Sequence, residues 1–230
     1  MINKPKAIIF DMDGVIVDSM PYHFISWYEA LRPEGVRVTC FDVYAKEGER
    51  WEKTIRDFLR RESIRPTPEV FKRIYARKQK YFRQYFKPRL FKGMEEFIAC
   101  LKHKGYKLGL VTGTPAQDIK AILPVEIISK FDIVVAGDSV KKGKPHPEPY
   151  LTAAKLLELD PAKCVVIENA PYGIESAKRA GMFCIALATS LPKEYLTAAD
   201  VVVNRLKEVT RIIGKTCVPK RVRLSERIIG

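Results

Sequence analysis

The chain has 230 residues, 47% of them hydrophobic, so it can fold around a sizeable core and is not a disordered segment. Its formal net charge of +14 favours anionic partners, and residues 53–92 alone carry 14 Lys and Arg against three acidic residues. The five cysteines contain no Cys-x-x-Cys pair, which argues against a zinc knuckle and favours reduced thiols. No apolar run reaches the ~20 residues of a membrane span, so we expect a cytoplasmic protein without a membrane anchor.

The first predicted element is a buried strand over residues 7–10, which is short, apolar and partly β-branched. Asp11 and Asp13 follow it directly, with Gly14 behind them. Two acids so close together repel each other, and such a pair is tolerated mainly where a cation or a proton lies between them. Taken alone, this Asp-x-Asp-Gly sequence is equally consistent with an ordinary turn at the end of a strand.

Residues 18–90 have helical periodicity throughout, which predicts an all-helical insert after the first strand. Ser19 is expected to cap the first helix, because a hydroxyl at this position accepts a hydrogen bond from a free backbone N–H. Further helices are expected at 39–47, from Trp51 onward, and from Thr67 until Pro88 ends the last one.

From residue 93 the pattern changes to strands that alternate with helices, with strands expected at 106–111, 133–135, 164–167, 183–187 and 201–203. This alternation predicts an α/β fold with a doubly wound parallel sheet, a Rossmann-like core that carries the all-helical cap domain. The expected boundaries are 1–17 and 91–213 for the catalytic core, 18–90 for the helical cap and 214–230 for a basic C-terminal extension. We assign no function to this extension.

Polar side chains suited to one reaction recur where successive predicted strands end. They are Asp11 and Asp13, then Thr112, then Glu168 and Asn169, with Lys144 in a loop at the same edge. The carboxyl ends of parallel strands are where ligands bind in an open α/β sheet. Acids that can hold Mg²⁺, one lysine and one hydroxyl are what phosphoryl transfer requires. The whole set in order is therefore much stronger support for an active site than any member alone.

These residues resemble the motifs of the haloacid dehalogenase superfamily, in the branch that has a helical cap after the first strand. The resemblance covers roughly residues 6–213 and includes four motifs in order. They are Asp11-Met12-Asp13-Gly14-Val15, Val111-Thr112-Gly113-Thr114, Lys144-Pro145-His146-Pro147, and Ile167-Glu168-Asn169 with Gly173-Ile174 and Ala180-Gly181. A phosphatase is implied over a dehalogenase, because the second Asp of the first motif marks the phosphoryl-transfer members.

The resemblance implies that Asp11 is the nucleophile and that Asp13 is the general acid and base. Thr112, Gly113 and Thr114 would hold the phosphoryl oxygens, and Lys144 would neutralise their charge. Mg²⁺ would be bound by Asp11, by the backbone carbonyl of Asp13 and by Glu168 or Asn169. Many relatives have Glu-Asp at the last two positions, so the neutral amide here leaves the metal affinity and the ligand set open. His23 and Arg50 are candidate substrate contacts from the cap. A structural or hydrogen-bonding role fits His23 equally well, and a solvated surface arginine is the alternative for Arg50.

A nearer resemblance is to the β-phosphoglucomutases, through residues 11–27 and 48–55. Those enzymes hold the second phosphate of their substrate with an Arg where this chain has Trp51, and they have a Lys where it has Pro115. We therefore expect a phosphatase for small phosphate monoesters and keep a mutase as the alternative. A nucleic-acid-binding protein is a further alternative from the basic charge, but no nucleic-acid module is recognisable. The expected partner is a small phosphorylated substrate such as phosphoglycolate, a sugar phosphate or a nucleotide, with no nucleic acid, no membrane and a monomeric chain.

Overall fold

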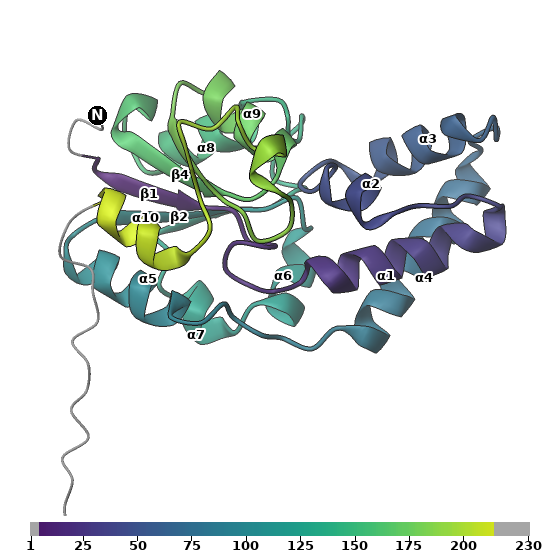
Figure 1. Ribbon diagram of the computed structural model, residues 1–230, viewed down its shortest axis with the longest axis horizontal. Coiled ribbons are helices and arrows are strands. Elements are labelled where there is room, and N and C mark those ends of the chain that lie inside the picture. Colours follow the sequence, from purple (N-terminus) through teal and green to yellow (C-terminus); the bar gives the residue numbers. More distant parts are fainter. Residues whose placement is uncertain (1–4, 214–230) are drawn as a thin grey trace, which may run out of the picture.

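The computed structural model describes residues 5–213 and contains a six-stranded, wholly parallel sheet (Figure 1). The strand order is β3-β2-β1-β4-β5-β6, the order of a doubly wound nucleotide-binding fold. The strands are β1 (Ala7–Phe10), β2 (Lys107–Val111), β3 (Ile133–Val135), β4 (Cys164–Glu168), β5 (Phe183–Leu187) and β6 (Val201–Val203). The predicted α/β class and parallel sheet are confirmed.

Helices cover both faces of the sheet because the strands are apolar on both sides (Figure 1). On β1 the side chains alternate: Ile8 and Phe10 pack into one core cluster, and Ala7 and Ile9 into the other. The first cluster is covered by α5 (Met94–His103), α6 (Ala116–Ile122), α7 (Val125–Ile128) and α10 (Leu206–Ile213). The second is covered by α8 (Glu148–Leu156) and α9 (Pro171–Arg179). The sheet is thus the middle layer of three.

Four helices between β1 and β2 form a separate unit beside the carboxyl edge of the sheet, here called the helical insert (Figure 1). They are α1 (Met20–Leu31), α2 (Cys40–Tyr44), α3 (Trp51–Arg61) and α4 (Pro68–Tyr85). The insert has its own core, in which Leu31, Ile55 and Ile74 are fully buried. The helices lie where the sequence predicts them, and the domain boundaries at 17/18 and 90/91 stay a prediction.

Two details differ from the sequence-based expectations. Ser19 stands at the N-cap position of α1 but makes no capping hydrogen bond, because its hydroxyl donates to Asp13 instead. The one-turn helix α7 is absent from the predicted elements, since four residues carry too little periodicity to be recognised. Among the described residues, Cys40, Cys164 and Cys184 are free thiols.

Within residues 5–213, no helix is both long enough and apolar enough to cross a membrane. The predicted basic extension at 214–230 lies outside the described residues.

Candidate active site

The side chain of Lys144 lies between two buried carboxylates at the carboxyl edge of the sheet. Its Nζ is 2.6 Å from Asp11 Oδ1 and 2.6 Å from Glu168 Oε1. Asp11 follows β1 and Glu168 ends β4, and these neighbouring strands continue pairing through a hydrogen bond from the Asp11 N–H to the Ile167 carbonyl. The place where β1 meets β4 is also where the strand order reverses, and that reversal opens a crevice for ligands.

Both oxygens of Glu168 are engaged by this surrounding structure. Oε1 accepts from the Tyr150 hydroxyl at 2.8 Å as well as from Lys144, and Oε2 accepts from the backbone N–H groups of Asn169 and Ala170. Glycine is required at position 173, since a Cβ there would lie 1.7 Å from Glu168 Oε1. Glu168 is therefore a fixed acceptor that orients Lys144.

Asp13 points to a second set of partners. Its Oδ1 accepts from the Ser19 hydroxyl at 2.6 Å and lies 3.0 Å from His23 Nε2, and its Oδ2 accepts from the Thr114 hydroxyl at 3.4 Å. Burial alone would raise the pKa of Asp13, but His23 and Ser19 together hold this pKa below its ordinary value. The two acids that stand two residues apart in sequence are thus separated into different hydrogen-bond networks.

The pKa of Asp11 shifts in the opposite direction. Burial raises this pKa well above the ordinary value, and the carboxylates of Glu168 and Asp13 add to the rise against the pull of Lys144. Burial would lower the pKa of Lys144, but Asp11 and Glu168 raise it above its ordinary value, so its ammonium group stays charged. A fixed cation beside a buried carboxylate can also offset the charge of an anionic ligand.

A cavity of about 330 Å³ lies between the helical insert and the edge of the sheet. It is lined by side chains from both halves of the molecule: His23, Glu47, Trp51 and Lys78 from the insert, and Gly113, Thr114 and Pro115 from the loop after β2. Thr112 lies beneath this loop, where its hydroxyl accepts from the Thr114 N–H at 3.1 Å. Arg50 is not among the lining residues, because its guanidinium turns away and donates to the Val140 carbonyl.

The buried side-chain oxygens that lack a hydrogen-bond partner within the described part of the chain are Asp11 Oδ2 and Asn169 Oδ1. An unpaired buried oxygen is costly unless a ligand satisfies it. Both atoms are hard oxygen donors at neighbouring strand ends, which is the ligand type that Mg²⁺ requires. The residues present therefore fit a magnesium ion, with Asn169 rather than the fully engaged Glu168 as the candidate ligand.

Sequence reasoning missed several polar residues of the site. Tyr150 and Ser19 hydrogen-bond the key carboxylates, and Glu47 and Lys78 face the cavity from the insert. Ser19 could be found only by asking what else a capping residue can reach. Lys78 carried no sequence signal, because it is one basic residue among many on α4.

A doubly wound parallel sheet with Asp11, Lys144 and Glu168 together at its switch point has the arrangement by which open α/β sheets bind ligands at their carboxyl edge. Residues 5–181 match the family model described as haloacid dehalogenase-like hydrolase, and the chain belongs to that family.

Curated relatives span nearly the whole chain. This protein is 30% identical to a phosphorylated carbohydrates phosphatase of Thermotoga maritima, over 90% of its own chain and 98% of the relative. It is also 30% identical to a beta-phosphoglucomutase of Bacillus subtilis, over 89% and 92% of the two chains. Among solved structures, a beta-phosphoglucomutase from Clostridium difficile superposes with a TM-score of 0.74 at 26% identity, covering 91% of this chain and 97% of that one.

Proposed function

We propose that the protein is a magnesium-dependent phosphatase that hydrolyses small phosphate monoesters through an aspartyl-phosphate at Asp11. The observation that carries this proposal is the state of the Asp11 carboxylate. Its Oδ1 is fixed by Lys144 at 2.6 Å, whereas its Oδ2 has no partner within the described residues. A buried carboxylate held in this way can give its unpartnered oxygen to a metal ion and present the oxygen beside Lys144 to phosphorus, as nucleophilic attack requires.

In the first step an Asp11 oxygen forms a bond to phosphorus while the bond from phosphorus to the leaving oxygen breaks. Asp13 gives that oxygen a proton, and it then takes a proton from the water that hydrolyses the acyl phosphate and restores Asp11. The lowered pKa of Asp13 keeps its carboxylate ionised, which is the form that can accept a proton from water. A bound phosphoryl group adds negative charge beside Asp13, which raises its pKa and suits the first role.

Charge on the phosphoryl oxygens is offset by Lys144, the Thr112 hydroxyl and the backbone N–H of Gly113. Asp11, Asn169 and the backbone carbonyl of Asp13 would hold Mg²⁺, which supplies further positive charge at the same oxygens. The role of His23 is to position Asp13, with which it shares a hydrogen bond of 3.0 Å. These assignments agree with the family resemblance and with the observed partners of each side chain.

The substrate class that the cavity favours is a phosphorylated sugar or polyol. The cavity volume of about 330 Å³ suits a small leaving group. Trp51 and Tyr75 stack on each other beside this cavity, with ring centroids 4.0 Å apart. Glu47 and Lys78 offer an acceptor and a donor for hydroxyl groups. The name of the Thermotoga maritima relative, a phosphatase of phosphorylated carbohydrates, agrees with this class.

The experiment that tests the proposal measures phosphate release by the Asp11→Asn variant. We expect turnover to fall at least about 10³-fold with the fold intact, because an amide cannot serve as the nucleophile. The matched control is Asp160→Asn, an isosteric change at an exposed turn remote from the site, which should keep full activity. Substantial activity in a folded Asp11→Asn sample would exclude the covalent mechanism.

The second candidate function is a β-phosphoglucomutase-type transfer, which the Bacillus subtilis relative supports. Against it, the cavity has Trp51 and Pro115 at the two positions that the resemblance associates with holding a second phosphate, and Arg50 is turned toward Val140. One mixture of β-glucose 1-phosphate, Mg²⁺ and a trace of glucose 1,6-bisphosphate distinguishes the two functions. We expect phosphate release to exceed isomerisation, and isomerisation faster by tenfold would reverse the assignment.

A further inference from the structure

Three metal-ligating side chains meet at the boundary between the sheet and the helical insert. Asp13 comes from the loop after β1, His23 from α1, and Glu47 from the segment between α2 and α3. One ligand atom of each lies within 4.8 Å of the other two, and Asp13 and His23 are buried. This trio is distinct from the pair of unpartnered oxygens on Asp11 and Asn169.

One pair of these atoms has the spacing of ligands around one tetrahedral ion, and the Glu47 oxygen lies within 4.8 Å of both. Bonds of about 2.0–2.1 Å to zinc place neighbouring ligand atoms roughly 3.3 Å apart. His23 Nε2 and Asp13 Oδ1 are already 3.0 Å apart, so both could contact one ion with little movement. An imidazole nitrogen combined with two carboxylates suits Zn²⁺ and related transition metals, whereas Mg²⁺ prefers oxygen ligands and water.

We propose that Asp13, His23 and Glu47 form a second, inhibitory metal site that takes a transition-metal dication such as Zn²⁺. The fourth ligand is water from the cavity, which Glu47 and His23 line. Binding of the ion does not depend on the proposed phosphatase activity. Inhibition does depend on it, because a bound ion occupies the carboxylate that serves as general acid and base.

The site also spans the two halves of the molecule. Two ligands belong to the helical insert, and Asp13 belongs to the loop that follows β1 of the sheet. The insert approaches the sheet closely here, since a Cβ on Gly113 would lie 3.1 Å from the Gly48 carbonyl oxygen, one residue from Glu47. An ion held by all three side chains would fix the insert against the sheet and close the route by which a substrate enters the cavity.

Lys78 opposes the cation and therefore sets its affinity. Its ammonium group interacts with the charges of both Glu47 and Asp13, and it lies 4.7 Å from the centre of the Phe82 ring. The ammonium group must move aside before a dication binds. Removing this positive charge should consequently strengthen metal binding, which is the opposite of what a general loss of structure would do.

The test is titration calorimetry with Zn²⁺ in the presence of saturating Mg²⁺, which keeps the Asp11 and Asn169 site filled. We expect one zinc to bind, about tenfold or more weakly in His23→Gln and in Glu47→Gln, and about tenfold more tightly in Lys78→Met. His146→Gln is the matched control, because His146 lies beside Glu148 on the surface and forms no part of the trio. Asn169→Ala should also bind zinc as the wild type does.

Hydrogen exchange gives a second readout that does not use activity. Zinc should slow amide exchange in α2 and α3 of the wild type, and should do so less in Glu47→Gln. Loss of binding in Asn169→Ala or in His146→Gln would overturn the proposal, because zinc would then occupy the magnesium site or the surface. Unchanged binding in both His23→Gln and Glu47→Gln, or weaker binding in Lys78→Met, would overturn it equally.

Discussion

Asn169 is the residue at which this chain departs from the commonest family pattern, and its two amide atoms have different surroundings. Its Nδ2 donates to the Ser190 hydroxyl at 3.0 Å, and its Oδ1 is buried without a partner among the described residues. The hydrogen bond to Ser190 thus fixes the amide so that only the oxygen is left for a ligand. A neutral ligand attracts a divalent cation less strongly than a carboxylate does.

We therefore expect Asn169→Asp to lower the Mg²⁺ concentration for half-maximal rate by about tenfold, since it adds one formal charge to a hard-cation site. Ser190 can reverse its hydrogen bond and donate to the new carboxylate. The measurement is phosphate release across a Mg²⁺ series, with Asn204→Asp, an exposed change of the same kind, as the control. An unchanged or higher Mg²⁺ requirement would show that position 169 does not bind the metal.

Gly173 also acts on its immediate surroundings. Because it has no side chain, it leaves room for the Glu168 carboxylate that orients Lys144. In Gly173→Ala the new methyl group would displace this carboxylate from Tyr150 and from the N–H groups of Asn169 and Ala170. We expect a loss of about 2–3 kcal/mol in the free energy of unfolding and at least a tenfold loss of kcat.

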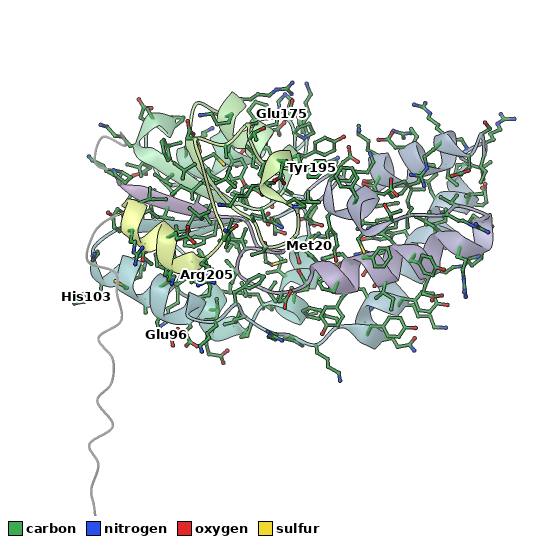
Figure 2. All side chains as sticks on the ribbon, viewed as in Figure 1. Met20, Glu96, His103, Glu175, Tyr195 and Arg205 are labelled. Atoms are coloured by element: carbon green, nitrogen blue, oxygen red, sulfur yellow. The ribbon has the colours of Figure 1, made fainter. Side chains whose placement is uncertain are left out.

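Urea unfolding and steady-state kinetics check this prediction for Gly173. The control on the same helix is Glu175→Ala, whose side chain is 41% exposed and pairs only with Arg179 in the described structure (Figure 2 labels Glu175). This control should cost a few tenths of a kcal/mol. Equal stability and kcat in Gly173→Ala and the wild type would show that Glu168 tolerates the displacement.

At the scale of elements, the helical insert is held together by packing and by several ion pairs, and one cluster of them joins α4 to the segment after α1. Glu34, at the end of the short 3₁₀ helix Arg32–Glu34, accepts hydrogen bonds from Arg73 and Arg77 of α4. The hydrogen bond from Arg73, followed by the one from Arg77, holds the pKa of Glu34 below its ordinary value of 4.5. A carboxylate with a depressed pKa stabilises the fold above that ordinary value, and this contribution is lost as the pH falls through the lower pKa of the folded state.

Glu34→Gln should accordingly lower the free energy of unfolding by about 1 kcal/mol at neutral pH, a figure reduced for solvent screening. The difference from the wild type should shrink as the pH drops below 4.5, and it should vanish below the lower pKa of the folded state, where the wild-type carboxylate is protonated as well. Urea denaturation at several pH values measures this. A difference that stays constant down to about pH 3 would show that the ion pair makes no such contribution.

Whether a feature could be predicted from the sequence depended on the length of the element and on whether its signal lies in neighbouring residues or in tertiary contacts. The strand Ala7–Phe10 and the helix Pro68–Tyr85 were predictable, because their apolar periodicity and flanking residues are local signals. The acids, Lys144 and Thr112 could be placed at one edge, because parallel strands align their carboxyl ends. The separate partners of Asp11 and Asp13 could not be predicted, since hydrogen bonds such as the one from Tyr150 to Glu168 depend on tertiary packing.

At the scale of the whole molecule, the helical insert and the sheet meet through a few specific contacts besides the cavity. Phe41 of α2 contacts Tyr195, which follows β5 (labelled in Figure 2), with ring centroids 4.7 Å apart. Gln79 of α4 hydrogen-bonds Asp118 of α6 at 3.1 Å. These contacts position the basic helix α4, which supplies Lys78 and Arg83, along one wall of the cavity.

The basic charge of the insert should therefore speed the arrival of a dianionic substrate. We expect kcat/KM to fall several-fold as the ionic strength rises from about 20 to about 200 mM, with kcat little changed. Lys80→Glu on α4 should lower kcat/KM more than Lys155→Glu, an equally exposed change on α8. Equal effects of the two substitutions would argue against steering by the insert.

The nucleic-acid alternative is checked in parallel by a gel shift over a salt series, where tight binding without turnover would favour it.

The central position of β1 also has a consequence for the order in which the chain is made. This strand is synthesised early, yet its two neighbours in the sheet, β2 and β4, begin at Lys107 and Cys164. More than 150 residues must therefore be synthesised after Asp11 before both Lys144 and Glu168 can pack beside it. A ribosome-bound chain that stops before β4 contains Asp11 but lacks Glu168 and Asn169, so we expect partly made chains to have no phosphatase activity. Late, long-range pairing of this kind also makes folding slow, which exposes the apolar β1 to aggregation while synthesis continues.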